Sequence, residues 1–563
     1  MCESIENQRS KSTENVIDLD RILKDEVGEC GLYQMRVLAL CAVLCFIMAL
    51  GGNNYIFFFA KSNTRCLIPE CESYSPQLNF TPSWISKAVP AAQGSFDSCH
   101  RYANTSVNAS DFCSAQLFDR ESVIKCEDYV YESKNSAYYE FNLACDDWRP
   151  NLIGSVKFIG FMISLPITGF VADRWGRRLA LFLTINCSWI SCIKYWINSY
   201  TSYIILEFLE ALIGGAAFSC VFILAIEYVG SKHRAAAGAA MTSFVAMGLT
   251  LQSIISWTGI YWRYLILIFN APLLIVIFCL WIAPESVRWL MSKGRYEESK
   301  VILENAAKMN GNILSDKTLK DLSEGLKLEE KNKNESEPWL ICLVFSHKRV
   351  LFHCILTPFW WITYLFIFYG LTMSAVTISG NMYLNYSAVY AIEIPGHCLA
   401  FLLLNRIGRK LLLTSGFWIC GACQVIYMLV PHGYYWQSLC IYLTGKLSIT
   451  VVVTAVYVYT AELFPTRYRT TLLTYSSMIG RLGAIFAPLT PSMSSAIWEL
   501  LPFVLFAGMA FLSGLLVLLA PETLGVKLPD TMQEANDLGR HSHSSILKPL
   551  RRLLFRQKSY TLR

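Results

Sequence analysis

Eight ionisable side chains stand inside otherwise apolar stretches of this sequence, where charge is costly and usually functional. Such a group can pair with another buried charge, respond to protons or contact a charged solute. No Gly-x-Ser-x-Gly, His-Glu-x-x-His or phosphate-binding Gly-rich Lys-Ser/Thr motif occurs. The sequence therefore predicts neither an enzyme nor ATP drive, and no cofactor or metal. The eight residues are Lys157, Lys194, Glu207, Glu210, Glu393, His397, Lys446 and Arg481.

Aromatic residues at helical spacing could complete a binding pocket. Trp361, Tyr364 and Phe368 would share one helix face, and Tyr457 lies in another apolar stretch. Rings that face a cavity attract ammonium groups, by up to about 2 kcal/mol when dry. Each ring could equally face lipid or pack against a neighbour. Two polar candidates for the same pocket are Asn54 and Gln252.

The stretches that carry these residues are long enough to span a membrane. Hydrophobic residues make up 54% of the 563 positions, charged residues make up 16%, and the mean hydropathy is +0.38. A spanning helix needs about 20 mainly apolar residues. The runs are continuous rather than alternating, which excludes a β-barrel. We predict an all-α membrane protein of twelve transmembrane helices that begin near residues 37, 151, 179, 203, 235, 264, 351, 381, 411, 437, 470 and 500.

Basic residues indicate the orientation of the chain. They crowd alternate loops, and the positive-inside rule makes those loops, and with an even number of spans both termini, cytosolic. The first thirty-odd residues are polar, so no cleavable signal peptide is expected. The net charge of +6 then reflects orientation rather than nucleic-acid binding. The basic residues of these loops are Arg174, Arg177, Arg178, Lys232, Arg234, Arg406, Arg409, Lys410, Arg467 and Arg469.

The long segment between the first two spans is expected to be an extracellular, disulfide-bonded and glycosylated loop. It holds six cysteines, an even set, which allow fifteen pairings. Glycans are added on the lumenal side, where the three sequons of this segment would lie. The cysteines are Cys66, Cys71, Cys99, Cys113, Cys126 and Cys145, and the acceptors are Asn79, Asn104 and Asn108.

Composition divides the chain into five parts. A charged central loop at 284–350 separates two six-helix halves at 37–283 and 351–521, and the first half includes the extracellular loop at 60–150. Cytosolic segments at 1–36 and 522–563 flank the halves, and the second of them is basic.

The two halves repeat one another. Asp-Arg-Trp-Gly-Arg-Arg at 173–178 is matched by Asn-Arg-Ile-Gly-Arg-Lys at 405–410. A Glu and an Arg seven residues apart stand at 227 and 234 and again at 462 and 469, and Pro-Glu-Ser at 284–286 matches Pro-Glu-Thr at 521–523. Internally repeated halves in register are typical of major facilitators.

The repeated charges predict an ion network at the cytosolic ends of the helices. Such a network can latch the outward-open state and must break when the cytosolic side opens. The alternative is that the charges only anchor the spans at the membrane interface. The gate residues are Asp173, Arg174, Arg177, Arg178, Glu227, Arg234, Glu285, Arg406, Arg409, Glu462, Arg467 and Arg469.

Several longer motifs join these marks. They are GFVADRWGRR at 169–178, PESVRWL at 284–290, YGLTMSAVTISGNMYLN at 369–385, AIEIPG at 391–396, YTAELFPTRYR at 459–469 and PETLGVKLPDT at 521–531. With the six-cysteine loop, they resemble the organic cation, organic anion and carnitine transporter family of the major facilitator superfamily over nearly the whole chain. The resemblance implies a plasma-membrane carrier that moves small organic ions by alternating access around a midplane cavity.

The resemblance also places Glu393, Arg481, Trp361 and Tyr364 near that cavity. Cation transporters of the family resemble one another in having Asp where this chain has Arg481, and anion and carnitine members have Arg. One carboxylate and one guanidinium suit a zwitterion, whose ammonium Glu393 would meet and whose carboxylate Arg481 would bind. Alternatively, Glu393 and Arg481 pair with each other or with Lys446 as structural partners.

Other residues depart from the family pattern or stay open. Lys157 and Glu207 are not expected from it, and Lys157 joins the list of substrate-site candidates. His397 stands where anion transporters tend to have Lys, and could be either proton-sensitive or simply packed.

The sequence thus predicts a monomeric transporter of small organic zwitterions or cations in the plasma membrane. Its partners are the solute, the lipid bilayer and an undetermined coupling ion, Na⁺ or H⁺. The rival substrate class is an organic anion, favoured by Arg481. A remote alternative is a membrane receptor on the same fold that does not transport.

Overall fold

The structure is a computed structural model of the chain. It describes residues 19–538 except 73–78, 93–94, 106–112, 231, 280–282, 316–317, 319–339, 376–377, 379, 432, 466–467, 525–528 and 530. Asn108, Arg467, residues 1–18 of the predicted N-terminal segment and most of the predicted C-terminal segment therefore lie outside the described residues.

Helices make up both halves of the chain. The first half contains α3 (Leu32–Leu50), α4 (Tyr55–Phe58), α7 (Arg149–Trp175), α8 (Arg177–Ile185), α9 (Cys187–Ile193), η3 (Lys194–Trp196), α10 (Tyr200–Gly214), α11 (Ala217–Tyr228), α12 (Arg234–Trp257) and α13 (Trp262–Cys279). The second contains α18 (Lys348–Ser374), α19 (Met382–Ala391), α20 (Glu393–Ile407), α21 (Arg409–Leu429), α22 (Tyr435–Leu463), α23 (Arg469–Phe486), η5 (Ala487–Leu489), α24 (Thr490–Ala496) and α25 (Leu501–Val517).

These elements account for the predicted spans. Among the described residues, ten helical segments, several of them made of consecutive shorter helices, are long and apolar enough to cross a membrane. Two shorter apolar helices, Trp262–Leu274 and Leu501–Val517, stand at the expected sixth and twelfth spans. The expected and observed helix starts agree closely because a run of apolar residues cannot leave backbone groups unpaired in lipid and must be helical.

Glycine separates consecutive helices at the repeated motif. Gly176 lies between α7 and α8 with φ 117°, and Gly408 lies between α20 and α21 with φ 97°. A side chain is disfavoured at these dihedral angles. The two halves therefore share a backbone break as well as a sequence motif.

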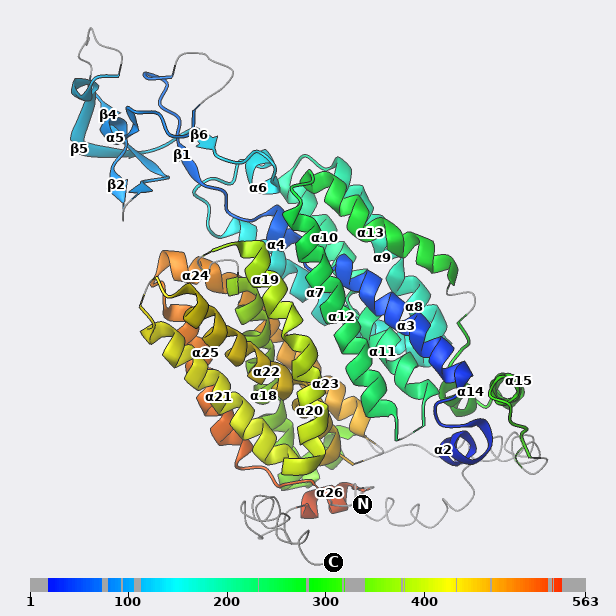
Figure 1. Ribbon diagram of the computed structural model, residues 1–563. Helices are drawn as coiled ribbons and strands as arrows, with labels where there is room; N and C mark the ends of the chain where they lie inside the picture. Colours follow the sequence, from blue (N-terminus) through cyan, green and yellow to red (C-terminus); the bar gives the residue numbers. More distant parts are fainter. Residues whose placement is uncertain are drawn as a thin grey trace, which may run out of the picture.

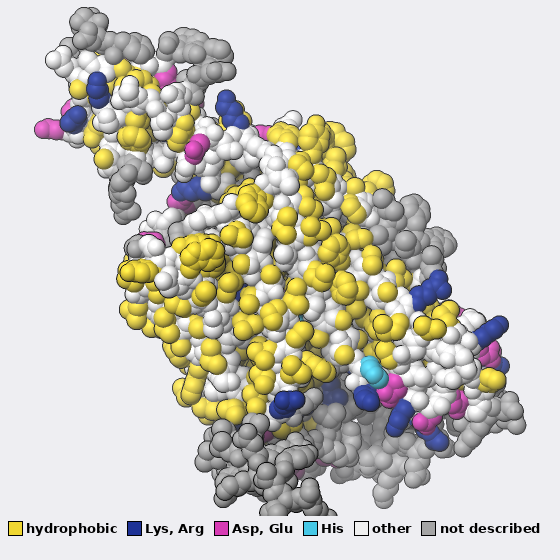
Figure 2. Space-filling model, viewed as in Figure 1, with side chains coloured by type: hydrophobic (Ala, Val, Ile, Leu, Met, Phe, Trp, Pro, Cys, Tyr) yellow, Lys and Arg dark blue, Asp and Glu magenta, His cyan; other side chains and the backbone are white. Residues whose placement is uncertain are grey.

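The helices form two bundles side by side (Figure 1). Between the bundles, α12 packs against α19 and α20, and α7 packs against α23. Hydrophobic side chains cover the side of the molecule, whereas charged side chains gather at its two ends (Figure 2). Large exposed apolar residues such as Trp189, Ile205 and Leu512 belong to this covering. The arrangement is that of a bundle whose sides face lipid.

A small β-rich cap stands at one end of the bundle (Figure 1). Its antiparallel pairs are β1 (Thr64–Cys66) with β6 (Tyr129–Tyr131), β2 (Ala91–Ala92) with β3 (Ser95–Phe96), and β4 (His100–Asn104) with β5 (Phe118–Lys125). The short helices α5 (Ile85–Ala88), η2 (Ala115–Leu117) and α6 (Ala137–Glu140) complete it. We call this end of the molecule the cap end.

Disulfides hold the cap together. All six predicted cysteines are paired, as Cys66–Cys126, Cys71–Cys113 and Cys99–Cys145. The first two bridges lie in a small core with Ile68, Ile85 and Phe118. A cap of this size has too few apolar residues for stability from burial alone, so covalent links supply the rest.

Short helices lie at the end opposite the cap (Figure 1). They are α2 (Leu19–Ile22), η1 (Leu23–Val27), α14 (Val287–Ser292), α15 (Tyr296–Met309), α17 (Leu340–Ser346) and α26 (Met532–Asp537). Asn310, which follows α15, links that helix to η1 and α3, because its side-chain amide donates to the carbonyl of Val27 and its oxygen accepts from the N–H of Tyr33. The described parts of the two terminal segments thus share one end.

Candidate functional site

An aromatic cluster lies where the second half faces the first. Trp361 and Tyr364 of α18 are buried, and their rings lie 5.3 Å apart. Tyr457 of α22 meets Trp361 edge to face at 4.5 Å. The Trp361 indole N–H donates to the hydroxyl of Thr460 at 3.1 Å. The spacing of α18 residues therefore brings these rings together, as a shared helix face requires.

Arg481 of α23 reaches into this cluster. Its guanidinium lies beside the phenols of Tyr364, Tyr369 and Tyr457. Its Nε is buried without a hydrogen-bond partner, and no carboxylate in the described part of the chain forms an ion pair with it. Arg481 therefore presents positive charge to an aromatic surrounding. Phe158 of α7 packs on Tyr369 at 4.6 Å, which brings the first half to the cluster.

Glu393 of α20 has a different environment. Its carboxylate forms an ion pair with Lys446 of α22 at 2.8 Å, and both side chains are buried. Lys446 also donates to the hydroxyl of Thr372 at 2.9 Å and lies 3.4 Å from the centroid of the Phe368 ring. This is the structural pairing that the sequence left open as an alternative. Glu393 is thus neutralised within the second half, and Phe368 covers its partner.

His397, one turn beyond Glu393 on α20, is buried. Its Nδ1 lies 3.2 Å from the hydroxyl of Thr454. The structure thus places it as a packed, hydrogen-bonded histidine beside the Glu393–Lys446 pair.

The remaining three candidates gather at a break in the first span. Helix α3 ends at Leu50 and α4 begins at Tyr55, so the backbone between them is not helical. Gln252 of α12 donates to the carbonyl of Leu50 at 2.8 Å and to the side-chain oxygen of Asn54. Lys157 of α7 donates to the carbonyl of Gly52 at 2.5 Å and pairs with Glu207 at 2.8 Å. Asn54, Gln252 and Lys157 are therefore engaged in holding this break.

Contacts between the two halves continue from this break toward the cap end. Asn53 donates to the hydroxyl of Tyr390 at 3.0 Å, and the Tyr55 hydroxyl meets the sulfur of Met373 at 3.3 Å. Ser253 donates to the carbonyl of Tyr383 at 2.7 Å. These contacts join the first and second halves on the cap-end side of the aromatic cluster.

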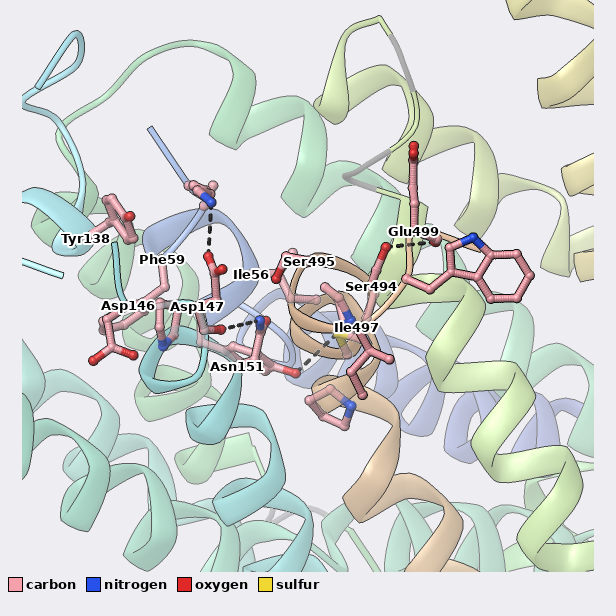
Figure 3. A pocket seen from close by; sticks show the side chains of 18 residues that line it. Ile56, Phe59, Tyr138, Asp146, Asp147, Asn151, Ser494, Ser495, Ile497 and Glu499 are labelled. Carbon is pink, nitrogen blue, oxygen red and sulfur yellow. Dashed lines mark hydrogen bonds and ion pairs between the residues drawn. The ribbon is translucent and has the colours of Figure 1, made fainter. Parts of the chain in front are cut away.

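A cavity of about 550 Å³ opens at the cap end of the interface between the two halves (Figure 3). Asn151 donates to Ser492, which in turn donates to the carbonyl of Asp147, across its wall. Lys61 pairs with Asp147 at 2.9 Å, and Trp498 and Glu499 line the opposite side. This cavity was not predicted, because its walls come from the ends of several spans and from the connections between them.

Ion clusters occupy the glycine breaks at the opposite end. Arg177 pairs with Asp173 at 2.6 Å and approaches Glu227 at 3.7 Å. Glu285 accepts hydrogen bonds from the backbone N–H groups of Arg177 and Arg178 at 3.0 and 3.2 Å. A carboxylate at the N-terminus of α8 is stabilised by the unpaired N–H groups and the helix dipole.

The second half repeats this arrangement. Arg409 forms a two-pronged contact with Glu462, with its nearest distance 3.0 Å. Glu522 accepts from the backbone N–H groups of Arg409 and Lys410 at 3.1 Å each, as Glu285 does in the first half. Glu522 was not among the predicted gate residues, although its position in the repeated Pro-Glu-Thr motif was a sufficient signal.

Four further arginines were predicted as gate residues, namely Arg174, Arg406, Arg234 and Arg469. Arg174 is exposed and stacks on Phe170 and Trp175, and Arg406 is exposed as well. Arg234 and Arg469 begin α12 and α23 at equivalent places in the two halves. The ion pairs of Arg177 with Asp173 and Glu227 join residues of the first half, and that of Arg409 with Glu462 joins residues of the second.

The sequence and fold of this chain can now be compared with those of known proteins. The family model described as "Sugar (and other) transporter" matches residues 120–534. The chain belongs to this family. It is thus a secondary transporter and not an enzyme, and its fold is the predicted major facilitator fold.

Relatives support the resemblance inferred from the motifs. An "Organic cation transporter protein" of Drosophila melanogaster is 29% identical, over 91% of this chain and 94% of the relative. "Organic cation/carnitine transporter 2" of Mus musculus is 28% identical, over 90% and 92%. "Solute carrier family 22 member 1" of Bos taurus is 28% identical, over 93% and 94%. The predicted relationship to organic cation and carnitine transporters is confirmed.

Solved structures agree on the fold. A partially occluded inward-open conformation of the xylose transporter XylE from E. coli has a TM-score of 0.53 at 18% identity. The similarity covers 68% of this chain and 89% of that one.

Proposed function

We propose that this chain moves a small organic zwitterion across the plasma membrane by alternating access. The carboxylate of the solute binds Arg481, and its ammonium group lies against the rings of Trp361, Tyr364 and Tyr457, whereas Phe368 is occupied by Lys446. This refines the class of organic zwitterions and cations that the sequence predicts. The named substrates of the organic cation and carnitine relatives support it.

The observation that carries the proposal is that Arg481 lies among tyrosines and forms no ion pair with a carboxylate in the described part of the chain. A guanidinium with a buried, unpartnered Nε is a ready donor for a carboxylate. The rings around it offer π faces to a cation at the other end of the solute. Because Lys446 neutralises Glu393, the rings rather than this acid are proposed to meet the ammonium group.

The proposed orientation puts the cap outside the cell and both termini in the cytosol. Asn79 and Asn104 are exposed on the cap, which suits glycan acceptors. The repeated ion clusters would then lie at the cytosolic face, where they bias the two states of the carrier. The chain is proposed to act as a monomer.

An organic anion is the second candidate substrate. It is favoured by the same guanidinium, since the described residues near Arg481 supply no free carboxylate to attract a cation. The two candidates differ in one expectation. The aromatic rings should contribute to the affinity for a zwitterion but not to the affinity for an anion.

Uptake measurements with Arg481→Ala test the proposal. We expect apparent affinity for a carnitine-like zwitterion to fall about tenfold or more, because a charge-assisted bidentate contact contributes roughly 1.5–3 kcal/mol. The apparent affinity for a cationic analogue without the carboxylate should fall far less. Arg174→Ala is the matched control and should leave both affinities unchanged, because that arginine is exposed far from the cluster.

Tyr457→Ala separates the two substrate classes. Loss of this ring should lower the apparent affinity for a zwitterion and leave the apparent affinity for a simple carboxylate unchanged. If carboxylates enter and zwitterions do not, the anion candidate replaces the zwitterion. If the wild-type chain takes up neither class in a saturable, exchangeable manner, the proposed function is wrong.

A further inference from the structure

Four charges lie buried together within the first half, outside the aromatic cluster. Lys157 of α7, Lys194 of η3, and Glu207 and Glu210 of α10 are 3%, 3%, 1% and 7% exposed. Lys194 contacts Glu207 at 2.6 Å and Glu210 at 2.5 Å. Lys157 contacts Glu207 at 2.8 Å and Glu210 at 3.9 Å. The cluster is therefore neutral as a whole, with two cations and two carboxylates.

Lys157 differs from Lys194 in one respect. Its ammonium also binds the main-chain carbonyl of Gly52, at 2.5 Å. That carbonyl belongs to the non-helical segment between α3 and α4, so no helical N–H competes for it. The ring of Tyr55, the first residue after the break, lies 5.8 Å from the same ammonium.

This combination of ligands is one that binds small cations. In secondary transporters, unwound backbone carbonyls of a broken span coordinate Na⁺ or H⁺, and a nearby carboxylate balances the charge. We propose that the Lys157 ammonium occupies an alkali-cation site at the break of the first span and acts there as a tethered cation. A charge that is covalently attached cannot dissociate, so transport would proceed without an alkali ion bound at this place.

The position of the site relates the charge of Lys157 to the contacts between the two halves. The segment that Lys157 holds carries Asn53, which reaches Tyr390 of the second half, and leads directly to Tyr55, which reaches Met373. A cation at the break therefore supports the contacts that join the halves toward the cap end. An empty site would leave an excess negative charge on the two buried glutamates and a bare carbonyl.

The test uses the purified full-length chain and needs no substrate. Thermal unfolding is compared in sodium chloride and in choline chloride at equal concentration, for wild type and Lys157→Ala. We expect Na⁺ to raise the Tm of Lys157→Ala by at least about 2 °C relative to choline, because a cation that binds only the folded state stabilises it. The Tm of the wild type should be the same in both salts, since its site is filled.

Two further variants separate a cation site from a general salt effect. Lys157→Arg keeps the charge, and Lys157→Ala with Glu207→Gln restores neutrality, so neither should respond to Na⁺. If Lys157→Ala does not survive purification, Lys157→Gln takes its place, and uptake in cells bathed in Na⁺ or choline gives a second measurement. A potassium arm distinguishes which alkali ion fits, and a response to either ion supports the site.

The proposal is overturned if the Lys157 variants have the same Tm in both salts, or if wild type responds to Na⁺ as strongly as they do. It concerns a charge built into the proposed carrier, but its assay is independent of the solute. Its failure would therefore leave the zwitterion proposal standing, and the reverse also holds.

Discussion

The ammonium of Lys446 lies 2.8 Å from the carboxylate of Glu393, and both side chains are buried between α20 and α22. Pairing of this kind consumes the charge of an acid that the family resemblance places near the substrate. It leaves Arg481, on the neighbouring α23, as the charged group of the aromatic cluster. The proposed substrate class therefore depends on Arg481 rather than on Glu393.

Removal of one partner of the pair should therefore destabilise the protein. Glu393→Gln leaves Lys446 buried without a counter-charge, and loss of one member of a buried ion pair costs about 3–5 kcal/mol. We expect a lower Tm and less protein at the cell surface. The double variant Glu393→Gln with Lys446→Met should recover most of the loss, because no charge is then left unpaired.

The same pair of variants can contradict the structural role. A stable Glu393→Gln protein that loses only the uptake of ammonium-bearing solutes would mean that Glu393 contacts the solute directly. Thermal unfolding and uptake of a matched cation and carboxylate, measured on the same preparations, distinguish the two results.

A second prediction concerns the ion clusters at the glycine breaks. Arg409 binds Glu462 through two nitrogens and is 12% exposed, whereas Arg174 is exposed and lies over the rings of Phe170 and Trp175. If the clusters bias one state of the carrier, Arg409→Ala should lower the maximal uptake rate about tenfold with little change in apparent affinity. Arg174→Ala should behave as wild type. A change confined to apparent affinity would show that Arg409 does not act through the conformational equilibrium.

The spans of this protein could be predicted from sequence because each depends only on a local run of apolar residues. Trp262 begins α13 near the expected start at 264, and Arg409 begins α21 near 411. The repeated motif was equally visible, since Gly176 and Gly408 stand at the same place in each half. These features need no knowledge of how helices rotate against one another.

Partnerships between spans could not be predicted in the same way. Whether Glu393 meets Lys446 or a solute depends on the faces that α20 and α22 turn to each other, and hydropathy does not report this. The cluster of Lys157 with Glu207 was missed for the same reason, although both were recognised as costly charges. Tyr369, two turns after Trp361 on α18, could have been found from helical spacing alone.

A third prediction concerns the covalent framework of the cap, for which sequence allowed fifteen pairings. Peptide mapping under non-reducing conditions should yield the links Cys66–Cys126, Cys71–Cys113 and Cys99–Cys145. Cys126→Ser should free Cys66 alone and impair surface delivery, because loss of a native disulfide from a small domain costs about 2–5 kcal/mol. Any other set of linked peptides would refute this pairing. Cys342, which is exposed at the opposite end and belongs to none of these disulfides, serves as the control and should not affect the cap when it is changed to Ser.

The last prediction concerns how α6, the last helix of the cap, docks on the bundle. Glu140 at the end of α6 accepts hydrogen bonds from Arg263 at 2.6 and 3.0 Å and from the indole N–H of Trp262 at 3.0 Å. Tyr261 donates to the same carboxylate. Partial burial by itself raises the pKa of Glu140, but these hydrogen bonds and the charge of Arg263 outweigh it, so that its pKa lies below the ordinary value of 4.5.

A pKa that is lower in the folded than in the unfolded protein fixes the direction of the pH effect. The stabilisation is fully present above the unfolded value, near pH 4.5, and is lost as the pH falls through the folded value. Glu140→Gln should therefore lower the Tm at pH 7, and its difference from wild type should shrink as the pH is lowered below about 4.5. Measuring the difference between the two proteins cancels the titration of all other groups. The exposed Glu121 on β5 supplies the control, since Glu121→Gln should differ little from wild type at any pH. A Glu140→Gln difference that stays constant down to about pH 3 would mean that the carboxylate does not hold α6 against α13.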